Sequence, residues 1–472
     1  MIVKPKAGLL PLYAGLYDKQ DPLEKNTYEP FIQAIAKKFT ALGIDVLDPL
    51  ICVYKCDIEA AIHRFENQNA CAVVILFLAY HPSMVSAKTL TQTDLPVIML
   101  DTTECYDFDS HTDPMMISRC HGIHGVQDLC CVLKRMGKEY RIETGHYQNS
   151  QVIDRVANII KSCYMADNFR KSRVGIIGQP FQDMGDFTIP FSKLENITGI
   201  QTIPFEKEKI LTWNCLVGAG EIDEKKQEII NSYKINGDLD SQLIEAASVS
   251  TLILEKWIMD EKLDAFTFNF LDFNQDLGLP TIPFVAACQL MAKGIAYAGE
   301  GDVLTAALIA AVMSIYPDSS FIEMFCPDWK NGTVFLSHMG EANRAVLRQP
   351  TLIKKQIPFV PGVNGGMIPA VAGFYQGGQA ILVNIAPEAN DKFHLILAPC
   401  EIIEPTDSDN YGLFIRGWLQ PDISLEQFLK KYSQLGGTHH SCLCYGAELA
   451  VLIEFGKMIG CNVSVIDHQI GE

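Results

Sequence analysis

The stretch Ala70–Tyr80, "ACAVVILFLAY", is a continuous apolar run. Such a run is typical of a β-strand that is buried on both faces of a parallel sheet. A helix-like segment, "IEAAIHRFENQ" (58–68), precedes it, and a second apolar run, "LPVIMLD" (95–101), follows it. Another strand-like run, "AGLLPLY" (7–13), lies further upstream. Strands that alternate with helices predict parallel βαβ units, with ligand groups at the carboxyl ends of the strands.

The same alternation returns in a second segment that begins near residue 169. Here we expect a strand at 174–177, a long helix at 240–262 and a strand at 265–271. The pattern changes near Phe325, where short strand-like runs are separated by Gly, Pro, Asn and Asp. Such runs predict an antiparallel sheet or a small barrel. We therefore expect three domains, with bounds 1–168, 169–324 and 325–472.

Composition limits the partners of the protein. The chain has 472 residues, 48% of them apolar, and a formal net charge of −18. An acidic protein is not expected to bind nucleic acid or an anionic membrane surface, because those partners require an excess of Lys and Arg. The apolar segment "TAALIAAVMSIY" is shorter than the roughly 20 residues that cross a bilayer. We therefore predict a globular protein that binds a neutral or cationic small molecule.

The cysteines indicate a reducing compartment. The chain has fifteen of them, and the adjacent Cys130 and Cys131 do not have the spacing of a disulfide framework. The other close pairs lack the pattern of a zinc ribbon. We expect most of these residues to be buried as small apolar side chains, in a cytoplasmic protein.

Three stretches carry carboxylates or imidazoles in unusual surroundings. Glu300 lies between two glycines in "AYAGEGDVLTAALIAA", just before the natural helix cap Asp302, so an acidic helix start is an alternative explanation. Glu323 is flanked by apolar residues in "DSSFIEMFCPD", and a buried carboxylate needs a partner. His338 in "NGTVFLSHMGEAN" shares a strand face with apolar residues, where a core histidine is the common alternative.

A fourth stretch, "QLGGTHHSCLCYG", contains the adjacent His439 and His440. Its residues favour a strand, in which successive side chains point to opposite faces, so we expect one of the two at most to face a site. Two carboxylates and two histidines from separate segments suit an octahedral divalent cation. Mixed Glu and His ligation favours Mn²⁺, and the lack of a thiolate disfavours structural zinc.

Together and in this order, these motifs resemble the L-arabinose isomerase family. The similarity is strongest at "YAGEGDVLTAAL", "SSFIEMF", "LSHMGE" and "GGTHHS…VSVID". The resemblance implies that Glu300, Glu323, His338 and His440 bind one Mn²⁺ per site. Of the adjacent pair it selects His440 as the metal ligand. This leaves His439 a role in packing or in contact with the metal ligands.

The resemblance also implies a fold, an assembly and an activity. The fold is two Rossmann-like (flavodoxin-like) parallel-sheet domains followed by a C-terminal antiparallel β-barrel domain. Residues 1–168 would form the substrate wall and the subunit contacts, 169–324 would carry the catalytic glutamates, and 325–472 the metal-binding histidines. The assembly is a homo-oligomer, a hexamer or one built on trimers, whose sites lie between subunits. The activity is the conversion of an aldose to its ketose, with Glu300 and Glu323 as acid and base in an order that stays open.

The substrate wall departs from the family pattern. The resemblance places Phe270, His81, His124 and Met184 around the sugar, but Gln127 stands where the family has an arginine. The loop after the first strand also differs, so the sugar, a pentose, a hexose or a deoxysugar, is not specified. Two alternatives stay open: an epimerase that uses the same metal site, and a sugar-binding assembly without catalysis.

Overall fold

The structure is a computed structural model that describes residues 4–237, 239–357, 367–405 and 409–468. The chain forms two compact units, Met1–Asp167 and Asn168–Glu472, and the boundary between them in the chain falls within helix α7 (Val152–Lys171). The predicted division at residues 324 and 325 falls within strand β11 (Ser319–Asp328). The three-domain organisation stays a prediction.

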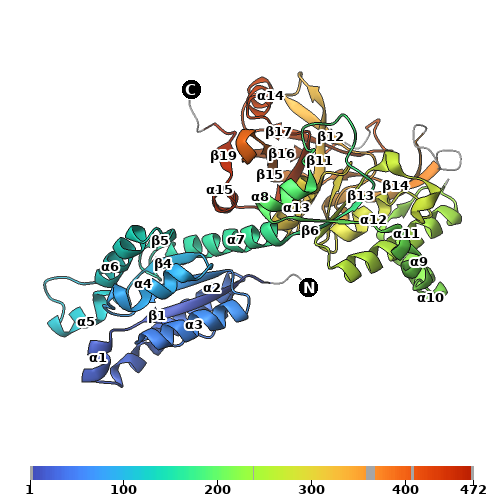
Figure 1. Cartoon of the computed structure of the whole chain (residues 1–472). Coiled ribbons are helices and arrows are strands. Elements are labelled where there is room, and N and C mark those ends of the chain that lie inside the picture. The colour runs from blue at the N-terminus through green and yellow to red at the C-terminus, as the bar shows by residue number, and fades with distance from the viewer. Residues whose placement is uncertain (1–3, 238, 358–366, 406–408, 469–472) are drawn as a thin grey trace. The chain divides into compact units, whose positions relative to one another are not determined.

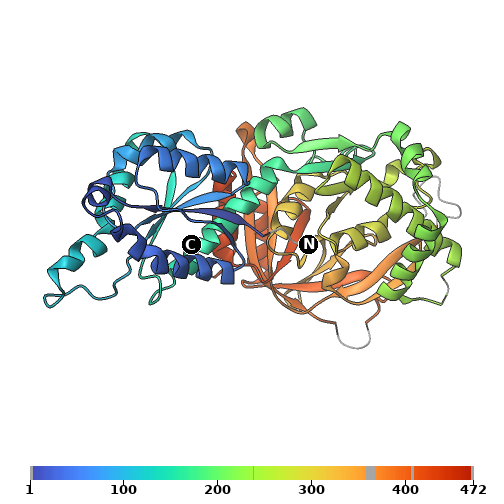
Figure 2. The ribbon, with the colours of Figure 1, turned by 90° about the horizontal axis from the view of Figure 1, so that it is seen from below.

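The first unit is built on a parallel sheet with strand order β2-β1-β3-β4-β5, and helices lie on both of its faces (Figure 1, Figure 2). This is the flavodoxin-like order, whose switch point lies between β1 and β3. The predicted strand at 70–80 is β3, and all of its residues are buried. The strands are β1 (Lys6–Leu12), β2 (Asp45–Leu47), β3 (Ala72–Phe77), β4 (Val97–Asp101) and β5 (Tyr140–Thr144). The helices are α1 (Gly15–Gln20), α2 (Glu29–Ala41), α3 (Lys55–Asn67), α4 (Ser83–Gln92), α5 (Ile117–Cys120) and α6 (Gly122–Arg135).

The second unit contains a smaller parallel sheet with strand order β10-β9-β6-β7. The predicted helix at 240–262 is α11, and the predicted strand at 265–271 is the shorter β9. The strands are β6 (Arg173–Ile177), β7 (Gln201–Pro204), β9 (Ala265–Phe268) and β10 (Ala296–Gly299). The helices are α8 (Phe191–Thr198), α9 (Lys207–Cys215), α10 (Ala219–Ser232), α11 (Ser241–Glu261), α12 (Phe284–Met291) and α13 (Val303–Met313). Both parallel-sheet predictions are confirmed.

The second unit also contains a large mixed sheet. Its order among the described residues is β19-β16-β15-β18-β11-β12-β17-β14-β13-β8. Because β16 also pairs with β17, six strands from β16 to β17 follow one another in a cycle of antiparallel pairings. The outer pairs β13–β8, β14–β17 and β16–β19 are parallel, so the sheet is not purely antiparallel. The strands besides β11 are β8 (Lys234–Ile235), β12 (Thr333–Ser337), β13 (Leu347–Gln356), β14 (Met367–Tyr375), β15 (Gly378–Pro387), β16 (Phe393–Ile403), β17 (Ile415–Pro421), β18 (His440–Tyr445) and β19 (Asn462–Val465), with helices α14 (Leu425–Gln434) and α15 (Leu449–Met458).

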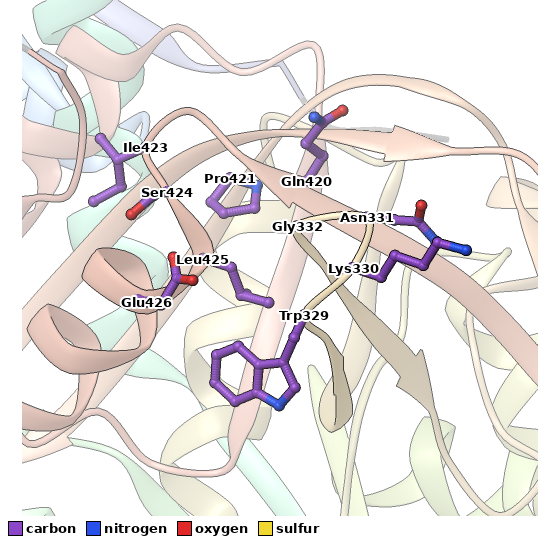
Figure 3. A pocket seen from close by; sticks show the side chains of 10 residues that line it. All are labelled: Trp329, Lys330, Asn331, Gly332, Gln420, Pro421, Ile423, Ser424, Leu425 and Glu426. Atoms are coloured by element: carbon purple, nitrogen blue, oxygen red, sulfur yellow. The ribbon is translucent and has the colours of Figure 1, made fainter.

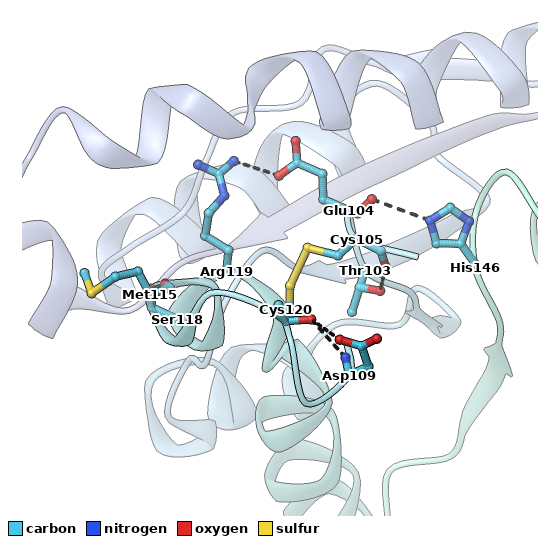
Figure 4. Close-up of a disulfide and its surroundings, with 10 residues drawn as sticks. Thr103, Glu104, Cys105, Asp109, Met115, Ser118, Arg119, Cys120 and His146 are labelled. Carbon is cyan, nitrogen blue, oxygen red and sulfur yellow. Dashed lines mark hydrogen bonds and ion pairs between the residues drawn. A yellow bond between two sulfur atoms is a disulfide. The ribbon is translucent and has the colours of Figure 1, made fainter. Parts of the chain in front are cut away.

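One disulfide joins Cys105 and Cys120 in the segment between β4 and α6 (Figure 4). The same segment is held by an ion pair between Arg119 and Glu104, at 2.7 Å. This pairing was not predictable from the sequence, because the two cysteines lie fifteen positions apart and no spacing pattern marks them. Seven other cysteines are buried as expected, namely Cys52, Cys71, Cys163, Cys288, Cys400, Cys442 and Cys444. No helix among the described residues is long and apolar enough to cross a membrane.

Candidate metal centre

Glu300 is held at the carboxyl end of β10 by a tight turn into α13. The backbone of Glu300 is left-handed, with φ 64°, and Gly301 follows with φ 89°. The Glu300 amide donates to Phe268 O at 2.9 Å, and the Gly301 amide donates to Thr267 Oγ1 at 3.0 Å. Asp302 caps α13 by accepting a hydrogen bond from the Thr305 amide. The turn therefore fixes the direction of the Glu300 side chain.

Strand pairing brings Glu323, His338 and His440 together. Glu323 on β11 lies opposite His440 on β18 and opposite Ser337, the last residue of β12. His338 follows Ser337 directly. As a result Glu323 Oε1 lies 3.0 Å from His440 Nε2 and 3.0 Å from His338 Nε2. His440 Nε2 also lies 3.5 Å from Glu300 Oε2.

His439 faces the same cluster as His440, so the expectation that one of the pair at most faces the site is wrong. The two ring centroids lie 4.1 Å apart, and His439 Nε2 lies 3.5 Å from Glu300 Oε2. The physical reason is that β18 begins at His440, so the alternation of strand side chains does not extend to His439. One donor atom each of Glu300, Glu323, His439 and His440 lies within 4.8 Å of the others.

Each histidine of the cluster has a carboxylate at its Nδ1 atom. Asp302 Oδ2 lies 2.9 Å from His440 Nδ1, and Asp186 Oδ2 lies 2.6 Å from His439 Nδ1. Glu341 Oε1 lies 3.0 Å from His338 Nδ1. The first two pairs are hydrogen bonds, which fix the orientation of the ring and leave Nε2 turned towards the cluster.

The donor atoms suit a divalent cation. Glu300 Oε2, Glu323 Oε1 and His440 Nε2 are buried and have no hydrogen-bond partner among the described residues, although the two carboxylate oxygens lie 3.5 and 3.0 Å from His440 Nε2. Buried polar atoms without a partner are costly. A cation between them would satisfy all three, and two carboxylates with imidazoles are ligands that Mn²⁺ and similar ions accept.

The electrostatics of the cluster are strongly coupled. Burial raises the pKa of the Glu323 carboxyl, but His338 and His440 outweigh it and hold that pKa well below its usual range. Burial lowers the pKa of His338, but Glu341 and Glu323 outweigh it and raise that pKa to about 10. Burial also opposes the ionisation of Glu300, yet its histidine neighbours hold its pKa below the usual value. In the absence of a metal ion the glutamates are therefore ionised and His338 is protonated at neutral pH, so a cation that uses His338 as a ligand must displace its proton.

The predicted substrate residues are divided between the two units. Phe270 is buried in the second unit against Phe181, with ring centroids 5.0 Å apart, and Met184 is half-buried in the loop after β6. In the first unit His81 is fully buried, whereas His124 is exposed and packs against the Tyr80 ring at 4.8 Å. Their roles in binding a sugar stay predictions.

Asp186 and Glu341 were not predicted as site residues, and Asp302 was predicted only as a helix cap. Glu341 follows His338 by three residues, and this short spacing was the available signal. Asp186 precedes His439 by 253 residues, so no local pattern relates the two.

A surface hollow of about 330 Å³ lies between the β11–β12 turn and the start of α14 (Figure 3). Its lining contains the exposed Trp329 with Lys330, Gln420 and Glu426. None of the candidate ligands lines it, so it is separate from the metal centre.

The fold and the cluster together define an α/β protein with a carboxylate and histidine centre of the kind that holds a divalent cation. Comparison with known protein families narrows this class to one family. The L-arabinose isomerase central domain matches residues 209–317, and the L-arabinose isomerase C-terminal domain matches residues 318–462. The chain belongs to the L-arabinose isomerase family.

Individual relatives match over most of their length. The chain is 23% identical to an L-arabinose isomerase of Bifidobacterium longum (strain DJO10A), over 87% of this chain and 83% of the relative. It is 25% identical to one of Klebsiella pneumoniae subsp. pneumoniae, over 85% and 82%, and 24% identical to one of Salmonella arizonae, over 88% and 84%. Among solved structures, a periplasmic solute binding protein of Actinobacillus succinogenes with bound D-allose covers 67% of this chain and 85% of its own, at 10% identity. Its TM-score of 0.18 is too low to support an argument.

Proposed function

We propose that the protein is a metal-dependent aldose–ketose isomerase of the L-arabinose isomerase type. The convergence of Glu300, Glu323 and His440 on one point, through buried atoms without hydrogen-bond partners, is the observation that carries this proposal. The family relationship supports the same activity. The proposed ligands are these three residues with His338, and the proposed ion is Mn²⁺.

The reaction moves hydrogen between C1 and C2 of an open-chain sugar. A divalent cation, when bound, would polarise the carbonyl and the neighbouring hydroxyl as a Lewis acid. The proton must leave one carbon and reach the other through an ene-diol, which requires an acid and a base. Glu300 and Glu323 are the proposed proton carriers, because both carboxylates are directed to the same point.

Substitution of the two glutamates tests the proposal. We expect Glu300→Gln and Glu323→Gln to abolish aldose–ketose turnover while far-UV circular dichroism stays unchanged. Glu426→Gln, on the exposed face of α14, is the matched control and should keep full activity. Full activity in either cluster variant would contradict the proposed function.

The sugar is best identified by a manganese-supplemented screen of pentoses, hexoses and 6-deoxyhexoses. Phe270, Met184, His81 and His124 are the proposed determinants of sugar selectivity. Product analysis by NMR separates a ketose from an epimer. An epimeric product would replace isomerisation with epimerisation at the same metal centre. Absence of bound manganese and of any turnover would favour a sugar-binding assembly.

We also propose a homo-oligomer of hexameric or trimer-based type, with sites between subunits. The support is a set of exposed apolar side chains on the first unit. Leu16 after β1, Met84 after β3 and Met115 after β4 are 75%, 75% and 78% exposed. All three lie in segments that follow strands of one parallel sheet, and exposed apolar side chains of this kind are candidates for protein contacts. The molar mass from light scattering tests the assembly.

The β-barrel and the cellular location of the protein are also proposed. We infer that the six-strand cycle from β16 to β17 is the β-barrel that the family resemblance implies. We also propose a cytoplasmic location. Thirteen free cysteines support it, whereas the Cys105–Cys120 disulfide does not.

A further inference from the structure

The loop between β6 and α8, residues 178–190, packs against the metal centre at three points. The Phe181 amide donates a hydrogen bond to Glu300 O at 3.0 Å. The Phe187 ring stacks on His440, with centroids 5.0 Å apart and an interplanar angle of 22°. Asp186 contacts His439. A loop 253 residues away in sequence thus borders the histidine pair.

Asp186 holds His439 by two hydrogen bonds to one oxygen atom. Asp186 Oδ2 accepts from the His439 backbone amide at 3.0 Å, and it lies 2.6 Å from His439 Nδ1. A carboxylate accepts hydrogen bonds, so Nδ1 carries a proton. In the neutral ring the lone pair is then on Nε2, which is the atom 3.5 Å from Glu300 Oε2.

The same arrangement occurs at His440 with a different degree of burial. Asp302 and the His440 side chain are fully buried, with 0% exposure, whereas the side chains of Asp186 and His439 are each 37% exposed. The core therefore fixes the orientation of His440. The orientation of His439 depends on the carboxylate of one loop residue.

We propose that Asp186 is a positioning residue that makes His439 a further donor to the metal ion in the sugar-free protein. The inference rests on the proposed metal centre and concerns a ligand that the family resemblance did not select. Its alternative is a doubly protonated His439 that bridges Asp186 and Glu300 as an ion pair and leaves the ion to the other ligands. The two arrangements differ in the number of imidazole nitrogens bound to the ion.

The test uses the full-length protein with Mn²⁺ alone as the probe. Isothermal titration measures the affinity for Mn²⁺, and pulsed EPR measures the ¹⁴N couplings of bound imidazoles. We expect Asp186→Ala to weaken Mn²⁺ binding about 10-fold or more and to remove one imidazole coupling. The Mn²⁺ affinity of Asp186→Asn should lie between those of the wild type and Asp186→Ala, because its amide oxygen still accepts a hydrogen bond from Nδ1. His439→Gln should match Asp186→Ala, and the double variant should lose nothing further.

Asp183 offers a matched control on the same loop. Its side chain makes no hydrogen bond or ion pair among the described residues, and Asn tolerates its left-handed backbone, φ 70°. Asp183→Asn removes the same charge and should leave the affinity and the couplings unchanged. Should Asp186→Ala fail to fold, Asp186→Asn and His439→Gln carry the comparison.

The outcomes distinguish the two proposals. Unchanged affinity and couplings in Asp186→Asn and His439→Gln would overturn the positioning role and leave the isomerase proposal intact. A wild-type protein that binds no Mn²⁺ would overturn the metal centre, and the inference with it.

Discussion

Asp302 illustrates at the residue scale how one carboxylate serves both the fold and the site. Its Oδ1 caps α13 through the Thr305 amide at 2.9 Å, and its Oδ2 lies 2.9 Å from His440 Nδ1. The side chain is fully buried. Helix capping and ligand orientation can be separated by substitution, because asparagine is also a good N-cap.

We therefore predict different outcomes for Asp302→Asn and Asp302→Ala. The asparagine variant keeps the cap but loses the negative partner of His440, so Mn²⁺ affinity should fall by about 10- to 100-fold with little change in stability. The alanine variant should lose similar affinity and in addition about 1 kcal/mol of unfolding free energy. Titration with Mn²⁺ and urea denaturation measure the two effects. Equal loss of stability in both variants would contradict the separation.

The burial of His81 predicts that the stability of the first unit depends on pH. Burial lowers the pKa of His81 in the folded protein to about 4, below its ordinary value of 6.5. Between these values the unfolded state binds the extra proton. Stability is therefore fully present above pH 6.5 and is lost as the pH falls towards 4, by about 3 kcal/mol in total.

His81→Gln should flatten this part of the stability profile. Urea denaturation followed by far-UV circular dichroism at pH 7 and pH 5 is the measurement. His111→Gln changes an exposed histidine of the same unit and should keep the wild-type slope. An unchanged slope in the His81 variant would remove this histidine as the cause.

At the element scale, the β10–α13 turn must approach the β6–α8 loop closely. A Cβ atom added at Gly301 would lie 2.5 Å from Pro180 Cα, and the backbone there has φ 89°. Only a residue without a side chain fits both conditions. The glycine therefore allows the Glu300 turn and the loop that carries Asp186 to lie against each other.

Gly301→Ala should lower the free energy of unfolding by more than backbone strain alone would. Gly294→Ala is the matched control, since Gly294 also has a left-handed backbone, φ 92°, but no atom within 4 Å of an added Cβ. We expect about 1 kcal/mol from strain in the control, and a further loss of about 1–3 kcal/mol with reduced Mn²⁺ affinity in Gly301→Ala. Urea denaturation and Mn²⁺ titration measure both. Equal costs would show that the contact with Pro180 is relieved by a small shift.

At the scale of the whole molecule, all candidate metal ligands and all four tryptophans belong to the second unit. Tryptophan fluorescence therefore reports unfolding of the unit that would bind the ion. A ligand that binds the folded state alone stabilises it by about 2.7 kcal/mol at a concentration 100 times its Kd.

We predict that Mn²⁺ at this concentration shifts the fluorescence-detected urea transition by that free energy. Glu323→Gln should abolish the shift, because it removes the carboxylate shared by His338 and His440. A wild-type transition that does not respond to Mn²⁺ would contradict the metal centre.

Much of this protein follows from its sequence alone. The apolar run around β3 and the periodicity of α11 identified these elements, because burial on both faces and a helical apolar stripe leave direct patterns in the residues. Glu323 was recognisable as a candidate ligand because an isolated carboxylate in an apolar run needs a partner, and Glu300 because it lies in a glycine turn before a helix. His440 was selected as a candidate only by the family resemblance. The family resemblance was carried by the same segments.

Only the tertiary structure decided which groups meet. Whether His439 faces the cluster depended on where β18 begins, and a sequence period cannot locate a strand end to within one residue. Asp186 is a partner of His439 because two segments that are 253 residues apart in the sequence pack together. Glu341 is a partner of His338 in the segment after β12, where no strand periodicity applies. Local residue patterns determine local backbone and burial, whereas the meeting of side chains across the chain depends on the long-range register of the folded sheets.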